Sequence, residues 1–131
     1  MDYQRKLDVD LPYDDAVART RKALAEQGFG ILTEIDLRAT LKAKRGVDIE
    51  PYVILGACNP ALAQRAIEVD RGVGVLLPCN VVVHGREGGG STIRVLEPEI
   101  FPVMTGLPAL QSVADEASRL LQGALDHIAA G

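Results

Sequence analysis

The sequence predicts an α+β fold: a two-layer α/β sandwich with a mixed sheet of about five strands, about four helices and a long C-terminal helix. Strand-like segments alternate with segments of helical periodicity along most of the chain. A glycine-rich turn joins the last two strand segments, and such a hairpin is incompatible with a purely parallel sheet. The 131 residues contain no linker-like segment, so residues 1–131 are expected to form a single domain.

Four elements are predicted in the first third of the chain. Residues 3–9 are expected to form an opening strand, which a proline then interrupts. Residues 14–27 are predicted as a helix, because two aspartates suit its N-terminus and a glycine is placed to end it. Residues 29–36 alternate with period two, which is typical of a half-exposed strand. Residues 37–45 are expected to form a short helix between a capping aspartate and a glycine.

The middle of the chain is predicted to hold the inner strands. Residues 51–58 form a strongly apolar strand segment. The Asn-Pro pair that follows predicts a helix, which should end near residue 70. Residues 75–84 form the next strong strand segment, and the glycine-rich turn after it predicts a partner strand at residues 91–97.

The final third combines an irregular connection with the longest helix. Prolines and a glycine at residues 98–108 predict the irregular stretch, and a continuous apolar stripe predicts a helix at residues 107–129. Residues 53–55 and 81–83 have no polar side chain on either face, and strands of this kind are covered on both faces. If the helices gather on one side of the sheet, the other side needs a second copy of the chain. We therefore expect a homodimer.

The chain's two cysteines lie in similar stretches, GACNP and LLPCN, in which asparagine follows each cysteine. Cys58 ends one inner strand directly before a helix N-terminus, where backbone N–H groups stabilise a thiolate. Cys79 opens the other inner strand. The two cysteines become neighbours only if these strands are antiparallel, which the sequence leaves open. If they meet, they could form a disulfide, hold a soft metal ion or share a persulfide.

Each of these residues also has a purely structural explanation. Unpaired cysteines are often core residues that fill space, and Asn59 has a complete role as a helix cap. Asn80, inside an apolar strand, needs hydrogen-bond partners and either bonds to a loop or lines a pocket. His84 shares the strand face of Asn80, opposite Cys79, so a zinc site that includes both is not expected. The candidate ligand-binding residues are therefore Cys58, Asn59, Cys79 and Asn80, with Cys58 and Cys79 as candidate metal ligands.

Composition excludes several classes of function. The net charge of −4 argues against a nucleic-acid partner, which needs clustered lysine and arginine. The longest nearly apolar run is too short for a membrane span, and the polar start of the sequence shows no secretory signal. Two cysteines without an export signal favour reduced thiols and a cytoplasmic location.

Four stretches together resemble the bacterial family called domain of unknown function 302. The main one is ILGACNPALAQRAIEVDRGVGVLLPCNVVV, and the others are DDAVARTRKALAEQGFGILTEID, ATLKAKRGVDIEPY and LEPEIF. They cover nearly the whole chain, although the loop at residues 86–90 is richer in glycine than the family pattern. The resemblance implies a small α+β domain that tends to pair as a homodimer. It implies no established activity, cofactor or catalytic residue set.

Three hypotheses for function follow. The first is a homodimeric cytoplasmic accessory module that binds a small molecule or soft metal ion near the two cysteine-asparagine pairs. The second is an enzyme that uses Cys58 as a thiol nucleophile, although no general base is evident. The third is a structural or partner-binding module in which both cysteines are packing residues. Whether the chain catalyses a reaction, and with which cofactor, is left open.

Overall fold

A computed structural model describes residues 1–131, and its five strands form one sheet. The strand order is β1-β5-β4-β3-β2, and every neighbouring pair is antiparallel. The sheet is therefore antiparallel throughout and not mixed, which corrects that part of the predicted fold class. The strand bounds are Gln4–Val9 (β1), Gly30–Asp36 (β2), Tyr52–Cys58 (β3), Cys79–Gly85 (β4) and Ser91–Leu96 (β5).

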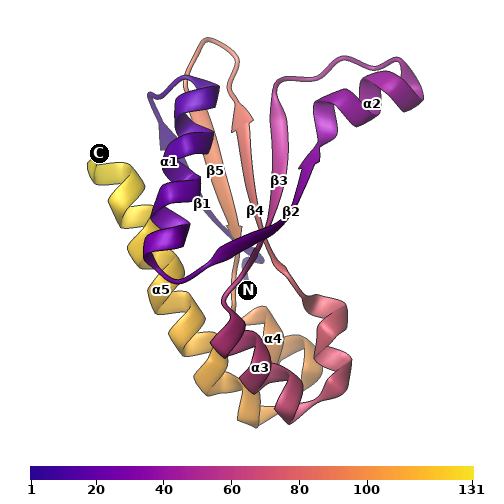
Figure 1. Ribbon diagram of the computed structural model, residues 1–131, viewed down its shortest axis with the longest axis vertical. Helices are drawn as coiled ribbons and strands as arrows, with labels where there is room; N and C mark the ends of the chain where they lie inside the picture. The colour runs from indigo at the N-terminus through magenta and orange to yellow at the C-terminus, as the bar shows by residue number, and fades with distance from the viewer.

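The helices confirm the second layer and the long C-terminal helix. Their bounds are Tyr13–Glu26 (α1), Leu37–Arg45 (α2), Pro60–Val69 (α3), Ile100–Thr105 (α4) and Gln111–Ala130 (α5). Figure 1 shows α1 and α5 on one side of the sheet, α3 and α4 beyond one of its ends, and α2 projecting from the other end. None of these helices combines the length and the apolar character that crossing a membrane requires.

Two segments differ from the expected elements. Residues 71–76 form a 3₁₀ helix, so β4 begins at Cys79 and is shorter than predicted. The stretch expected to be irregular contains α4, which was not predicted because prolines usually interrupt helices. Pro102 lies in the first turn of α4, where a missing backbone N–H removes no hydrogen bond within the helix.

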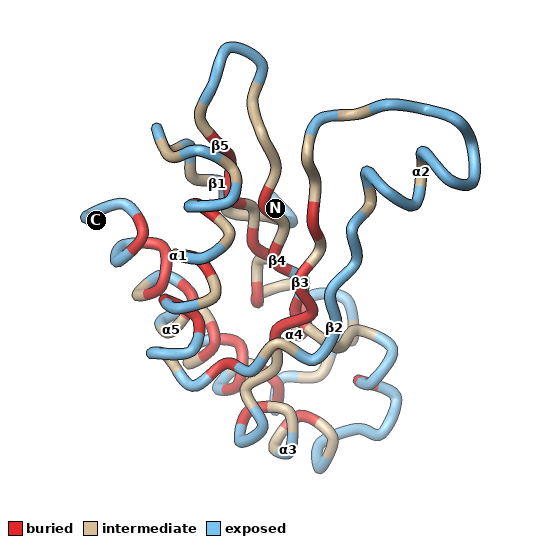
Figure 2. The backbone as a smooth tube through the Cα atoms, turned by 45° about the horizontal axis from the view of Figure 1, so that its top comes forward, coloured by how far each residue is buried: buried red, intermediate tan, exposed pale blue.

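The main core lies between the sheet and helices α1 and α5. Alternate residues of the central strands point into it, among them Leu55, Val81 and Ile93, which are almost fully buried. A second apolar cluster connects α3, α4 and the start of α5 to the start of β4 at Cys79. Figure 2 shows buried residues along β3, β4 and α5, whereas β2 and α2 are largely exposed.

The opposite face of the sheet carries no helix layer. The side chains between the core positions, such as Ile54, Val82 and Arg94, point to this face and are only partly buried. Helix α2 has no buried residue. The helices have therefore gathered on one side, which is the arrangement for which a second copy is expected.

Candidate functional site

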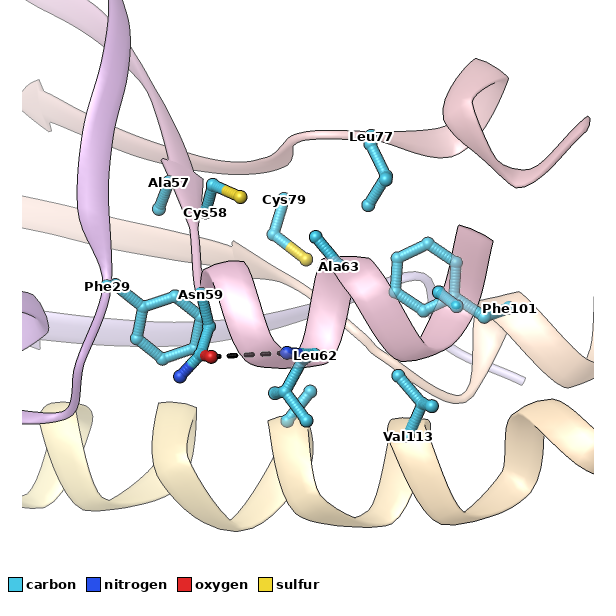
Figure 3. Close-up of a pocket in the computed structure, with 12 residues that line it drawn as sticks. Phe29, Ala57, Cys58, Asn59, Leu62, Ala63, Leu77, Cys79, Phe101 and Val113 are labelled. Carbon is cyan, nitrogen blue, oxygen red and sulfur yellow. Dashed lines mark hydrogen bonds between the residues drawn. The ribbon is translucent and has the colours of Figure 1, made fainter. Parts of the chain in front are cut away.

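A small cavity of about 30 Å³ lies where the ends of β3 and β4 meet α3, α4 and α5. The antiparallel pairing of these strands places the end of β3 beside the start of β4, with Ala57 opposite Cys79. Figure 3 shows the sulfur atoms of Cys58 and Cys79 in this region, close to the first turn of α3. The lining residues are Phe29, Ala57, Cys58, Asn59, Leu62, Ala63, Ala66, Leu77, Cys79, Phe101, Val113 and Ala117.

Both cysteines are free, and their surroundings differ. Cys79 is only 8% exposed, and burial together with the nearby Cys58 raises the pKa of its thiol to about 11. Cys79 is therefore a neutral thiol at physiological pH. Cys58 is half-buried and immediately precedes the start of α3. Of the two, Cys58 is the sulfur that solvent can reach.

Asn59 acts as the N-cap of α3. Its side-chain Oδ1 accepts a hydrogen bond of 3.3 Å from the backbone N–H of Leu62, drawn as a dashed line in Figure 3. Pro60 then occupies the first helical position, where its fixed φ suits a helix. Asn59 thus lines the cavity, and its side-chain oxygen is already used by the hydrogen bond that caps α3. The remaining polar atom of its side chain is the amide nitrogen, a hydrogen-bond donor.

Asn80 is not part of this cavity. Successive residues of a strand point to opposite faces, so Asn80 points away from Cys79 and is exposed on the face without helices. Of the four candidate residues, the structure brings Cys58, Asn59 and Cys79 to one cavity and leaves Asn80 outside it. His84 lies on the same outer face as Asn80, as its position in the strand predicts.

The chemistry available in the cavity is narrow. None of its lining residues is a carboxylate, histidine, lysine or arginine. No group of three or more histidine, cysteine or acidic side chains in the chain is placed to hold a metal ion. The cavity therefore offers two thiols, one amide and apolar walls. This set suits a soft ion or a small apolar species and provides no side chain for general acid–base catalysis.

Much of the cavity wall was not identified from the sequence. Phe29 follows α1, Phe101 lies on α4, and Val113 belongs to α5. These residues are far apart along the chain and meet only because three helices converge at one end of the sheet. Each has the ordinary sequence signal of a core residue, so nothing marks it as part of a site.

The fold and site define a small two-layer α+β domain with a cysteine-lined cavity at one end of an antiparallel sheet. The chain belongs to the family described as domain of unknown function DUF302, whose pattern matches residues 5–128. It is similar to a solved structure described as the uncharacterized conserved protein DUF302 from Bacillus stearothermophilus. The two chains are 31% identical, with 98% of this chain and 99% of that chain covered and a TM-score of 0.89. No curated protein matches the chain.

Proposed function

We propose that this chain is a homodimeric cytoplasmic accessory module that binds one soft metal ion, or a ligand of similar size, beside Cys58 and Cys79. One observation carries the proposal: two free cysteines from neighbouring strands line the same small cavity. Soft thiolate ligands favour Cu(I) over harder cations. Because the site offers two sulfur ligands and no acidic side chain, a monovalent soft ion is the best match.

The size of the cavity also favours an ion. A volume of about 10–15 Å³ holds one water molecule, so a cavity of about 30 Å³ accepts only a very small occupant without rearrangement. Binding of Cu(I) would form two copper–sulfur bonds and release two thiol protons to solvent, with no change in oxidation state. The resulting bis-thiolate carries one negative charge, and the N-terminus of the ten-residue helix α3 beside Cys58 stabilises it.

The homodimer is supported by the exposed apolar residues of β2 and the connection after α2. Leu32 is 67% exposed, Ile35 is 45% exposed and Val47 is 46% exposed. Leu32 and Ile35 lie on β2, the edge strand beside β3, and Val47 follows α2, which projects beyond the end of the sheet (Figure 1). Apolar surface gathered on a projecting segment is typical of an interface, and a second copy presents the same surface.

A measurement of the oligomeric state in solution tests the proposed dimer directly. Sedimentation velocity of the native protein is expected to give a dimer, and Ile35→Glu is expected to give a monomer because it places a charge in the contact. Val75→Glu is the matched control, because Val75 is 90% exposed on the 3₁₀ helix away from this surface. A monomeric native protein would overturn the dimer. A dimer unaffected by Ile35→Glu would overturn its placement.

The cytoplasmic location is supported by the two reduced thiols. A compartment that keeps cysteines reduced favours a chain whose two cysteines are free.

Anaerobic competition between the protein and a chromophoric Cu(I) chelator tests the site. The native protein is expected to withdraw one equivalent of Cu(I), and Cys58→Ser or Cys79→Ser is expected to weaken binding at least tenfold. Met104→Leu is the control, because it removes an exposed sulfur outside the cavity and should leave affinity unchanged. Failure to compete, or equal affinity in both cysteine variants and the native protein, would refute the proposal.

The alternative, a thiol-dependent enzyme, would use Cys58 as its nucleophile, since Cys58 is the more exposed sulfur and precedes a helix N-terminus. Its alkylation rate measured against pH tests this idea. An apparent pKa well below that of an ordinary thiol would favour the enzyme. A profile typical of an unactivated thiol would exclude it, and the lack of a general base in the cavity favours this second outcome.

A purely structural or partner-binding module is the remaining alternative. It predicts that the cysteine variants lose stability while the native protein shows no affinity for Cu(I).

A further inference from the structure

A second hollow, of about 190 Å³, lies on the outer face of the sheet, away from the cysteines. Residues of β1, β3, β4 and β5 line it, and its polar groups come from Arg94, Asn80 and Gln4. Its apolar walls include Tyr3, Tyr52 and Val82. Asn80, which the sequence predicts as a ligand-binding residue, lines this hollow.

Arg94 is held in position by two neighbours. Its Nε donates a hydrogen bond of 3.0 Å to Nε2 of His84, and its Nη1 donates one of 3.2 Å to Oε1 of Gln4. His84 stacks on Tyr52, with ring centroids 5.5 Å apart and an interplanar angle of 9°. Nδ1 of His84 lies 3.0 Å from the carbonyl oxygen of Gly85, which can only accept, so Nδ1 carries the proton and Nε2 accepts from Arg94.

This network leaves the far end of the guanidinium without a partner. Nη2 of Arg94 makes no hydrogen bond, and no carboxylate lies within 4.0 Å of the side chain's nitrogen atoms. The acid on the same face, Asp8, accepts a hydrogen bond of 2.7 Å from Thr92 and lies 3.9 Å from both Lys6 and Arg86. Arg94 is the only charged residue among those that line the hollow, although the whole chain carries a net charge of −4.

A guanidinium with a fixed orientation and free N–H groups is a typical recognition element for carboxylates. The side chain of Asn80 is exposed and has no hydrogen-bond partner, so its amide adds a second donor at the rim. The apolar walls accept the body of the ligand. An engineered apolar cavity of about 150 Å³ binds benzene, so a hollow of about 190 Å³ has room for a ring that carries a carboxylate.

We propose that this hollow binds a small organic carboxylate about the size of benzoate, whose carboxylate accepts from Arg94 and whose ring lies against Tyr52 and Val82. The site lies mainly on β4 and β5, shares only Tyr52 of β3 with the surface proposed for the dimer, and is separate from the cysteine cavity. It is therefore a second binding function and does not depend on the metal proposal.

The test is a titration of the ¹⁵N-labelled native protein with benzoate, followed by NMR, with benzamide as the uncharged control of the same shape. Saturable shifts of the Val82 and Arg94 amides are expected with benzoate, with at least tenfold weaker binding of benzamide. Arg94→Met should weaken benzoate binding at least tenfold. Arg119→Met is the matched control, because Arg119 is exposed on α5 and forms no ion pair, and it should leave benzoate binding unchanged.

Several results would overturn the proposal. It fails if benzoate causes no saturable shift, if benzamide binds equally well, or if Arg94→Met retains full affinity. The comparison of benzoate with benzamide uses only the native protein, so it tests carboxylate binding at the hollow even if Arg94→Met does not fold. A second copy that covers the hollow would also exclude benzoate and would count as failure. Cys58→Ser should leave benzoate binding unchanged, which separates this result from the metal-binding experiment.

Discussion

The buried thiol of Cys79 makes the stability of the fold fall at alkaline pH. Burial raises the pKa of this thiol from the ordinary 9.0 to about 11 in the folded protein. In the unfolded chain the thiol loses its proton near pH 9, whereas the folded protein keeps that proton. The unfolded state therefore binds fewer protons across this range, and the free energy of unfolding decreases as pH rises. The contribution of the buried, protonated Cys79 thiol to the free energy of unfolding is fully present below pH 9 and is lost by about pH 11.

The size of the loss follows from the two pKa values. Each unit of pKa corresponds to about 1.4 kcal/mol, so a rise from 9.0 to about 11 gives a loss of about 3 kcal/mol. At pH 8, Cys79→Ala should be less stable than the native protein by about 1–2 kcal/mol, because it removes one buried atom and leaves a void. By pH 11 the order should reverse, because the variant has no buried thiolate.

Urea unfolding under reducing conditions at pH 8, 9, 10 and 11 measures this difference. Titration of lysines and tyrosines affects both proteins alike, so it cancels in the comparison. Cys58→Ala is the control, because it removes a half-buried thiol and leaves Cys79 in place. It should retain most of the alkaline loss. A stability gap between the native protein and Cys79→Ala that stays constant from pH 8 to pH 11 would refute the reasoning.

Three further predictions concern caps and an ion pair. Gly28→Ala should lower the free energy of unfolding by about 1–2 kcal/mol, because the φ of Gly28 is +83° and the added Cβ would lie 3.2 Å from Nδ2 of Asn59. Gly46→Ala should lower it by less, because the φ of Gly46 is +65° and no atom lies within 4 Å of the added Cβ. Thermal unfolding compares the two, and equal losses would show that the Asn59 contact is unimportant. Asn59→Ala should cost about 1 kcal/mol through loss of the α3 cap, whereas Asn59→Ser should restore most of it. Glu97→Gln should destabilise by about 1–2 kcal/mol at pH 7, because Arg5 makes two hydrogen bonds to this carboxylate, at 2.6 and 2.9 Å, and lowers its pKa. That loss should vanish as pH falls below the pKa of Glu97, and a loss that persists in acid would contradict the assignment.

Local signals were sufficient to predict most elements. Helix α2 has the predicted bounds, since Asp36 caps it through the N–H of Ala39 and Gly46 ends it in the left-handed conformation. The start of α3 at Asn59 and Pro60 follows the same logic. Caps of this kind depend on residues within one turn of each other, so the sequence contains the whole interaction.

Strand direction and pairing depend on distant residues and were not predictable in the same way. The mixed sheet was wrong because the sequence does not determine how β1 and β2 add to the central strands. They occupy opposite edges of the sheet, and each runs antiparallel to its neighbour. The meeting of Cys58 with Cys79 depended on this same unknown, and the antiparallel pairing of β3 with β4 decides it.

The grouping of Asn80 with the cysteines failed for a simpler reason. Adjacent residues of a strand point to opposite faces, so a shared motif in the sequence separates in space. Cys79 faces the core, and Asn80 faces the hollow beside Arg94. The adjacent residues Cys79 and Asn80 therefore contribute to two different surfaces of the domain.

The most direct test of the central claim is a crystal structure of the native protein loaded anaerobically with Cu(I), with data collected at the copper absorption edge. We expect a single anomalous peak bonded to the sulfur atoms of both Cys58 and Cys79, within the cavity between β3, β4 and α3. An empty cavity under these conditions, or copper bound elsewhere on the chain, would contradict the proposed function.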